Sequence, residues 1–92
     1  MGDPMTRVLT IVNEKGLHAR ASAKLVELVE EFDADAVVSK DGIDVTGDSI
    51  MGLLMLTAAR GTQIEVKTSG NDAEALADAI EALVADRFGE KE

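Results

Sequence analysis

The 92-residue sequence contains no cysteine, no tryptophan and no tyrosine, and only one histidine, one proline and two phenylalanines. Without cysteine there can be no disulfide, thiolate metal site or cysteine nucleophile. One histidine excludes a metal site built from several histidines of one chain. So few aromatic side chains also argue against a surface on which nucleic-acid bases stack. We therefore expect neither a metal nor a cofactor.

Basic residues are also scarce, because nine Lys and Arg stand against eighteen Asp and Glu, for a formal net charge of −9. That charge opposes binding to nucleic acid or to an anionic membrane. No apolar run approaches the roughly 20 residues of a membrane-spanning helix, and no signal-peptide pattern opens the chain. The sequence therefore predicts a cytoplasmic protein that binds neither nucleic acid nor membranes.

The remaining composition, 46% hydrophobic and 29% charged, is typical of a folded domain. The length suits one small domain, since two would each fall below the usual size. Residues 1–4 precede a second methionine, Met5, and are interpreted as a cloning remnant or a disordered segment. We expect the single domain to span residues 5–88 and a flexible tail to follow at residues 89–92.

The order of periodic segments predicts the fold class. Segments with strand-like alternation or β-branched residues are 6–12, 37–40, 43–46 and 62–67. Apolar residues at helical spacing occur over 17–32, 50–55 and 76–84. The Asp41-Gly42 pair favours a two-residue hairpin turn, because both positions accept a positive φ. The resulting βαββαβα order predicts an α+β two-layer open-faced sandwich, a four-stranded antiparallel sheet covered on one face by three helices.

The segment around the single histidine carries the most chemical information. Residues 15–24 include Lys15, Arg20 and Lys24 but no acidic residue. They lie at the predicted start of a helix, where unpaired backbone N–H groups and the helix dipole favour an anion, most often phosphate. A nitrogen of the His18 imidazole is a nucleophile that could take a phosphoryl group.

The anion site would include the first helical residues, Ala19 and Arg20, and the Arg20 guanidinium could neutralise phosphate oxygens. A simpler interpretation remains open at this point. A lone histidine after a glycine is often an ordinary helix-start residue, and three basic residues gather by chance in many helices. Composition and spacing do not decide between these two interpretations.

A resemblance favours the phosphoryl interpretation. The segment Gly16-Leu17-His18-Ala19-Arg20 resembles the active-site signature of HPr, the histidine phosphocarrier of the phosphoenolpyruvate-dependent phosphotransferase system. A second block, residues 47–56, resembles the regulatory-serine segment of that family and contains Ser49. The similarity covers residues 5–88. The segment Ile64-Glu65-Val66 and the acidic last helix are more similar to the nitrogen-branch, NPr-like relatives than to dedicated sugar carriers.

The resemblance implies a phosphoryl relay. His18 would accept phosphoryl from enzyme I and pass it to a histidine of an enzyme IIA-type protein, while Arg20 holds the phosphate. The protein would be a monomeric carrier rather than an enzyme. Ser49 would be a regulatory phosphorylation site for an HPr kinase/phosphorylase. Two alternatives stay open: an allosteric binding protein that signals through its phosphorylation state, and a non-catalytic interaction domain. Whether the relay serves sugar uptake or nitrogen regulation also stays open.

Two departures from the family pattern concern the first helix. Ala21 stands where the family usually has proline, and Glu27 and Glu30 stand where many sugar-branch carriers have lysines. Alanine is an excellent helix former, so the helix itself should be retained. The two glutamates affect which partner proteins would dock.

We also expect a docking surface on the second helix. For a helix of about two turns packed on a sheet, Leu53 and Leu56 can supply the buried face. The other apolar residues would then form a partly exposed patch for protein partners. The residues expected in this patch are Leu17, Ile50, Met51 and Leu54.

Overall fold

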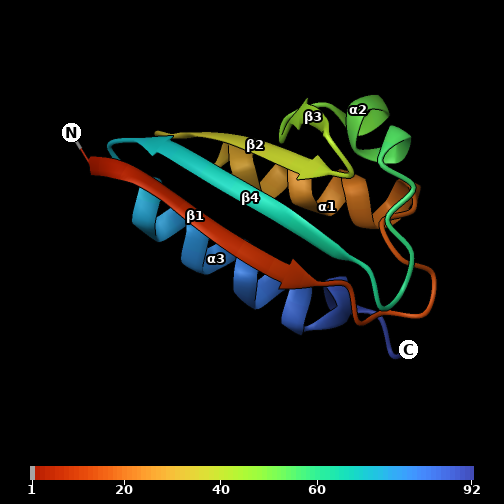
Figure 1. The fold of residues 1–92 in the computed structure, drawn as a ribbon. Coiled ribbons are helices and arrows are strands. Elements are labelled where there is room, and N and C mark those ends of the chain that lie inside the picture. Colours follow the sequence, from red (N-terminus) through yellow and green to blue (C-terminus); the bar gives the residue numbers. More distant parts are fainter. Residues whose placement is uncertain (1) are drawn as a thin grey trace.

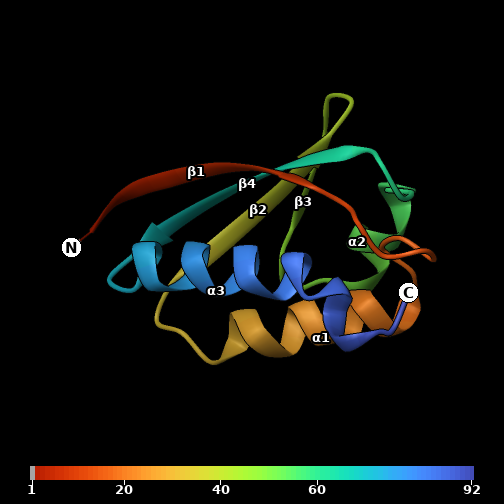
Figure 2. The same ribbon diagram turned by 90° about the horizontal axis from the view of Figure 1, so that it is seen from below.

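The computed structural model describes residues 2–92 and shows the predicted order of elements. These are β1 (Gly2–Thr10), α1 (Ala19–Glu30), β2 (Asp35–Lys40), β3 (Ile43–Thr46), α2 (Ile50–Met55), β4 (Gln63–Gly70), α3 (Ala73–Ala85) and a 3-10 turn, η1 (Arg87–Gly89). The strands form one antiparallel sheet in the order β1-β4-β2-β3. The helices lie on one face of this sheet and leave the other face uncovered (Figures 1 and 2). The predicted α+β open-faced sandwich is confirmed.

The core lies between the sheet and the helices. Strand residues alternate across the sheet, so that every second side chain faces the helices. Leu9 on β1 and Ile11 just after it are both buried. The helices contribute buried aliphatic side chains from their inner faces, among them Leu25, Leu76 and Ile80.

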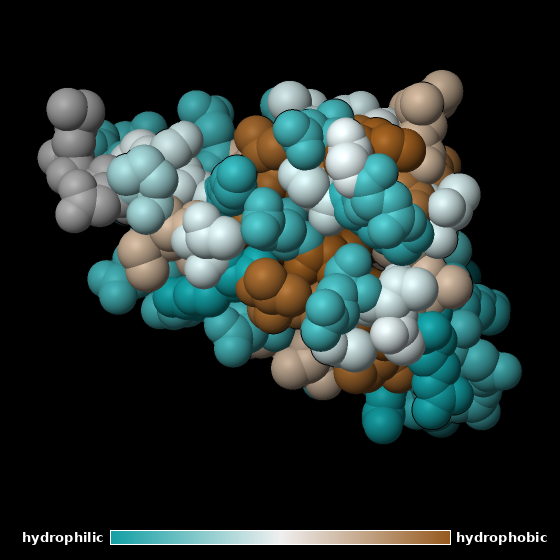
Figure 3. Space-filling view, in the orientation of Figure 1, coloured by the Kyte–Doolittle hydropathy of each residue, from teal (hydrophilic) through white to brown (hydrophobic). Residues whose placement is uncertain are grey.

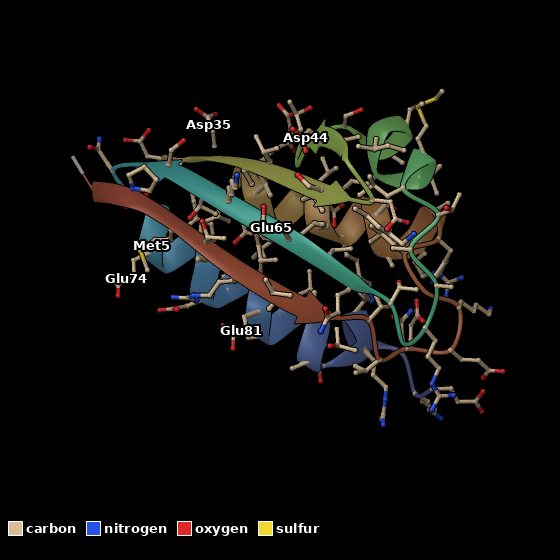
Figure 4. All side chains as sticks on the ribbon, viewed as in Figure 1. Met5, Asp35, Asp44, Glu65, Glu74 and Glu81 are labelled. Atoms are coloured by element: carbon tan, nitrogen blue, oxygen red, sulfur yellow. The ribbon has the colours of Figure 1, made fainter. Side chains whose placement is uncertain are left out.

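The uncovered face of the sheet is mainly hydrophilic, with apolar side chains in separate spots (Figure 3). Charged side chains on this face include Asp35 on β2, Asp44 on β3 and Glu65 on β4 (Figure 4). Among residues 2–92, no helix combines the length and the apolar composition needed to cross a membrane. The same residues contain no cluster of three or more His, Cys, Asp or Glu suited to a metal ion.

Both ends of the chain differ from the sequence-based expectation. The first strand begins at Gly2 rather than Thr6, because Gly2 pairs with Gly70 across a β4 strand that is longer than predicted. Gly2–Pro4 therefore belong to the sheet, whereas we expected residues 1–4 outside the fold. Proline is tolerated there because β1 is an edge strand. Met1 lies outside the described residues.

The C-terminal residues fold back over the domain instead of leaving it as a free tail. Arg87 and Phe88 adopt positive φ angles of 57° and 54°, which turn the chain after α3. The Phe88 side chain is fully buried, and its backbone oxygen accepts a hydrogen bond of 2.6 Å from Lys24 Nζ. The backbone N–H of Glu14 donates to the backbone oxygen of Glu92 at 2.9 Å. These contacts hold residues 89–92 beside the start of α1.

Candidate functional site

His18 occupies the N-cap position of α1. Its backbone is extended, with φ −79° and ψ −176°, and its carbonyl accepts the first helical hydrogen bond from Ser22 N–H at 2.8 Å. The N–H groups of the first turn therefore have no partner within the helix. The imidazole makes no capping hydrogen bond, and 27% of the side chain is exposed. The ring therefore takes no part in capping the helix and lies at a helix end that favours anions.

The loop before His18 is fixed by a close backbone approach. Gly16 has φ +67°, and a Cβ at this position would lie 2.4 Å from the backbone oxygen of Ala58. The next residue, Leu17, donates its backbone N–H to the same Ala58 oxygen at 2.9 Å. The histidine loop is therefore docked on the segment that follows α2. Figures 1 and 2 show α2 and the start of α1 at the same end of the molecule.

Two residues that the sequence did not indicate complete the site. Glu90 Oε2 contacts His18 Nε2, and Glu90 Oε1 accepts a hydrogen bond of 3.0 Å from Asn13 Nδ2. Asn13 is fully buried and also donates to the Gly16 carbonyl at 2.8 Å. Burial alone would raise the pKa of the Glu90 carboxyl. Hydrogen bonds from Asn13 and His18 lower this pKa, as do the charges of His18 and Lys15, and together they have the larger effect. The net pKa lies below the ordinary value, so Glu90 is ionised at neutral pH.

His18 and Arg20 face a common depression of about 350 Å³ at the surface. All three basic residues of the 15–24 segment line it, although Lys24 is also bonded to the Phe88 carbonyl. Ala19 is exposed at the helix start beside them. The folded-back tail adds two acidic residues that are distant from His18 in the sequence, Glu90 and Glu92. The complete lining is Glu14, Lys15, His18, Arg20, Lys24, Gly89, Glu90, Lys91 and Glu92.

Ser49 caps α2, since its Oγ accepts a hydrogen bond of 3.0 Å from Gly52 N–H. The predicted division of this helix also holds, because Leu53 and Leu56 are buried. Apolar side chains on the outer face are exposed by 38% or more: Ile50, Met51, Leu54 and Met55, which we call the α2 patch.

Leu17 does not belong to this exposed surface, and the prediction that it forms part of the docking patch is wrong. Only 4% of the residue is exposed, and its side chain is part of the hydrophobic core. The reason is the docked loop, because the backbone hydrogen bond from Leu17 to Ala58 holds the loop against the domain with the Leu17 side chain in the core.

Comparison with known proteins identifies the family. The model for the phosphotransferase-system HPr component phosphorylation site matches residues 5–86 of the chain. The chain belongs to the HPr family. It is 46% identical over 88 residues to the phosphocarrier protein HPr of Cupriavidus necator, covering 96% of this chain and 99% of that protein.

Other HPr-family members show the same extent of similarity. The phosphocarrier protein NPr of Shewanella violacea is 43% identical over 86 residues, which is 94% of each chain. The crystal structure of HPr-C-His from Thermoanaerobacter tengcongensis superposes with a TM-score of 0.91 at 32% identity, covering 96% of this chain and 99% of that one. This HPr-family protein is thus a phosphoryl carrier of the phosphotransferase system rather than a catalyst.

Proposed function

We propose that His18 accepts a phosphoryl group from phosphorylated enzyme I and passes it to a histidine of an enzyme IIA-type protein. The observation that carries this proposal is the position of the single histidine of the chain, a partly exposed ring at the anion-favouring end of α1. A phosphorylated imidazole is a high-energy phosphoramidate, which suits relay. An open depression suits it as well, because two different proteins must reach the same nitrogen.

Arg20 is the proposed phosphate-binding side chain. It is exposed at the second position of α1 and lines the depression with His18. A guanidinium can bind two phosphate oxygens at once through its planar fork, in addition to the helix N–H groups.

We expect Arg20→Ala to fold normally but to accept phosphoryl from enzyme I slowly, with transition-state stabilisation reduced by about 1.5–3 kcal/mol for a lost charge-assisted bond. Arg20→Lys should restore only part of the rate, since an ammonium group lacks the fork. Lys67→Ala is the charge control, because it removes one exposed positive charge from the uncovered side of the sheet. Rapid-quench labelling measures the three rates. Equal rates in Arg20→Ala and Lys67→Ala would exclude Arg20 from the site.

The α2 patch is the proposed docking surface for enzyme I. Figure 2 shows α2 at the same end of the molecule as the start of α1, whose N-cap is His18. Met51 is the most exposed member of the patch, at 75%. We expect Met51→Gln to weaken enzyme I binding by about 1–2 kcal/mol, because exposed apolar anchors contribute most to such interfaces. Thermal unfolding should be nearly unchanged. A large loss of stability with unchanged affinity, measured by calorimetry, would show that Met51 acts only in packing.

Ser49 is the proposed regulatory phosphorylation site, modified by an HPr kinase/phosphorylase. A phosphate there would place about two negative charges beside the α2 patch and oppose docking by repulsion and by the cost of desolvation. We therefore expect Ser49→Asp to accept phosphoryl at His18 more slowly than the unaltered protein, with Ser49→Ala close to normal apart from about 1 kcal/mol of lost capping stability.

Ser69→Asp provides the matched control for this experiment, because Ser69 is an exposed residue near the end of β4, on another element. Enzyme I assays on the four proteins separate a local effect from one of net charge. Equal rates for all four, with no labelling by the kinase, would leave Ser49 with the capping role alone.

A further inference from the structure

A chain of polar contacts joins the loop before α1, the C-terminal tail and the His18 ring. Asn13 Nδ2 donates to Glu90 Oε1 at 3.0 Å, and Glu90 Oε2 contacts His18 Nε2. Because Asn13 is fully buried and also bonded to the Gly16 carbonyl, it anchors the carboxylate to the folded domain. Only 14% of the Glu90 side chain is exposed. Both oxygens of this carboxylate are therefore held in a sheltered place.

These contacts determine where the imidazole proton lies. An ionised carboxylate is only an acceptor, so Nε2 of His18 must carry the hydrogen that lies between the two groups. In the neutral ring the other nitrogen, Nδ1, then holds the free lone pair. A ring without this contact could exchange its proton between the two nitrogens and rotate about the Cβ–Cγ bond.

We propose that Glu90 is the positioning residue of His18: it holds the proton on Nε2, orients the ring so that Nδ1 is the nucleophile, and pairs with the positive charge of the phosphorylated ring. This inference rests on the proposed function, in which His18 is the phosphoryl acceptor. Asn13 supports it by fixing the carboxylate.

The transfer step balances with this proton in place. The Nδ1 lone pair of His18 forms a bond to phosphorus as the N–P bond of the donor phosphohistidine breaks, and that electron pair returns to the donor ring. The Nε2 proton stays where it was, so the phosphorylated His18 ring becomes a cation next to the Glu90 carboxylate. In the onward transfer the same retained proton lets His18 leave as a neutral imidazole. A carboxylate that orients a histidine and stabilises its cation has this role in catalytic triads.

The other charged groups at the depression differ from Glu90 in their contacts. Lys15, Arg20 and Lys24 are cations on the loop and on α1, and Lys91 is a cation on the tail. Glu14 and Glu92 also line it, and a side-chain hydrogen bond to Glu14 raises the pKa of Glu92. Glu92 thus has the same charge type on the same tail, directed to Glu14. It offers a matched control.

The test compares the unaltered protein with Glu90→Ala and Glu92→Ala. In the unphosphorylated proteins, nuclear magnetic resonance at low temperature should show a downfield proton bonded to His18 Nε2 in the unaltered protein and in Glu92→Ala. The signal should be absent from Glu90→Ala, where the sheltering acceptor is gone. Phosphoryl acceptance from enzyme I should be about tenfold slower in Glu90→Ala than in Glu92→Ala, the scale of a hydrogen bond to a charged group, although each variant removes one acidic side chain from the depression.

Amide spectra of both variants check that the fold is retained. Loss of the Nε2 proton signal together with slow transfer in Glu90→Ala alone supports the proposal. If either the signal or the rate of Glu90→Ala matches that of Glu92→Ala, the proposal is overturned. A failure of the proposed function looks different, because then the unaltered protein itself would take no phosphoryl group on His18 while the proton signal could still be observed.

Discussion

His18→Ala is expected to accept no phosphoryl group from phosphoenolpyruvate and enzyme I. Alanine has no nucleophilic atom, and the chain contains no second histidine and no cysteine to replace it. The substitution should leave the fold intact, because the ring makes no capping hydrogen bond and is partly exposed. Radioactive labelling followed by gel electrophoresis measures the effect.

The chemistry of the label provides an independent check on this result. A phosphoramidate on the unaltered protein should be lost in mild acid and kept in alkali. The Ser49→Ala protein is a useful comparison, since it lacks the proposed regulatory hydroxyl and keeps His18. Label that persists at a normal level in His18→Ala would show that the acceptor is another residue.

Gly16→Ala is expected to lower the free energy of unfolding by about 2–5 kcal/mol. Gly16 has a left-handed backbone conformation, with φ +67°. This conformation destabilises a residue that carries a Cβ by roughly 1–2 kcal/mol. The added Cβ would also lie 2.4 Å from the Ala58 backbone oxygen, and such overpacking costs about another 1–3 kcal/mol. Because the neighbour is backbone rather than a flexible side chain, the loop must move to relieve the contact. Thermal or denaturant unfolding measures the loss.

Gly61→Ala separates the two contributions. Gly61 has φ +87°, but a Cβ there would meet no atom within 4 Å. Its replacement should cost only the backbone term, about 1–2 kcal/mol. We further expect Gly16→Ala, but not Gly61→Ala, to slow phosphoryl acceptance, because the loop that carries His18 has to shift. Equal losses of stability in the two variants would mean that the close approach to Ala58 contributes nothing.

The fold was predictable from the sequence because local signals and the final packing agree. The Asp41-Gly42 turn has positive φ at both residues, 52° and 81°, as a two-residue hairpin requires. Ser49 caps α2, and the apolar residues of the helices face the sheet. Each of these features depends on neighbours within a few positions, which is the range over which spacing and turn chemistry can be interpreted.

The site was predictable only in part, because its remaining contacts join distant segments. Glu90 lies 72 positions from His18, and no local pattern indicates that the tail returns to α1. No local pattern indicates the role of Asn13 either, because its contact with Glu90 depends on that same return. The prediction for Leu17 is wrong because Leu17 lies in a loop. A loop residue belongs to no periodic pattern from which its burial could be predicted. The burial of Leu17 follows from the Ala58 contact.

In the alternative function, the protein only signals through its phosphorylation state. Such a protein needs one partner that phosphorylates it, whereas a relay needs a second partner that removes the group from the same nitrogen. The depression around His18 is open and is lined by charges of both signs. Incubation of purified phosphorylated protein with an enzyme IIA-type acceptor distinguishes the two roles.

The most direct test of the proposed relay is to locate the phosphoryl group on the unaltered protein and to follow its transfer to an acceptor protein. After incubation with phosphoenolpyruvate and enzyme I, mass spectrometry under alkaline conditions should find one phosphoryl group, on His18. The group should then move to an enzyme IIA-type protein when that protein is added. A phosphoryl group on any other residue, or a phosphorylated His18 that transfers to no such acceptor, would contradict the proposed relay.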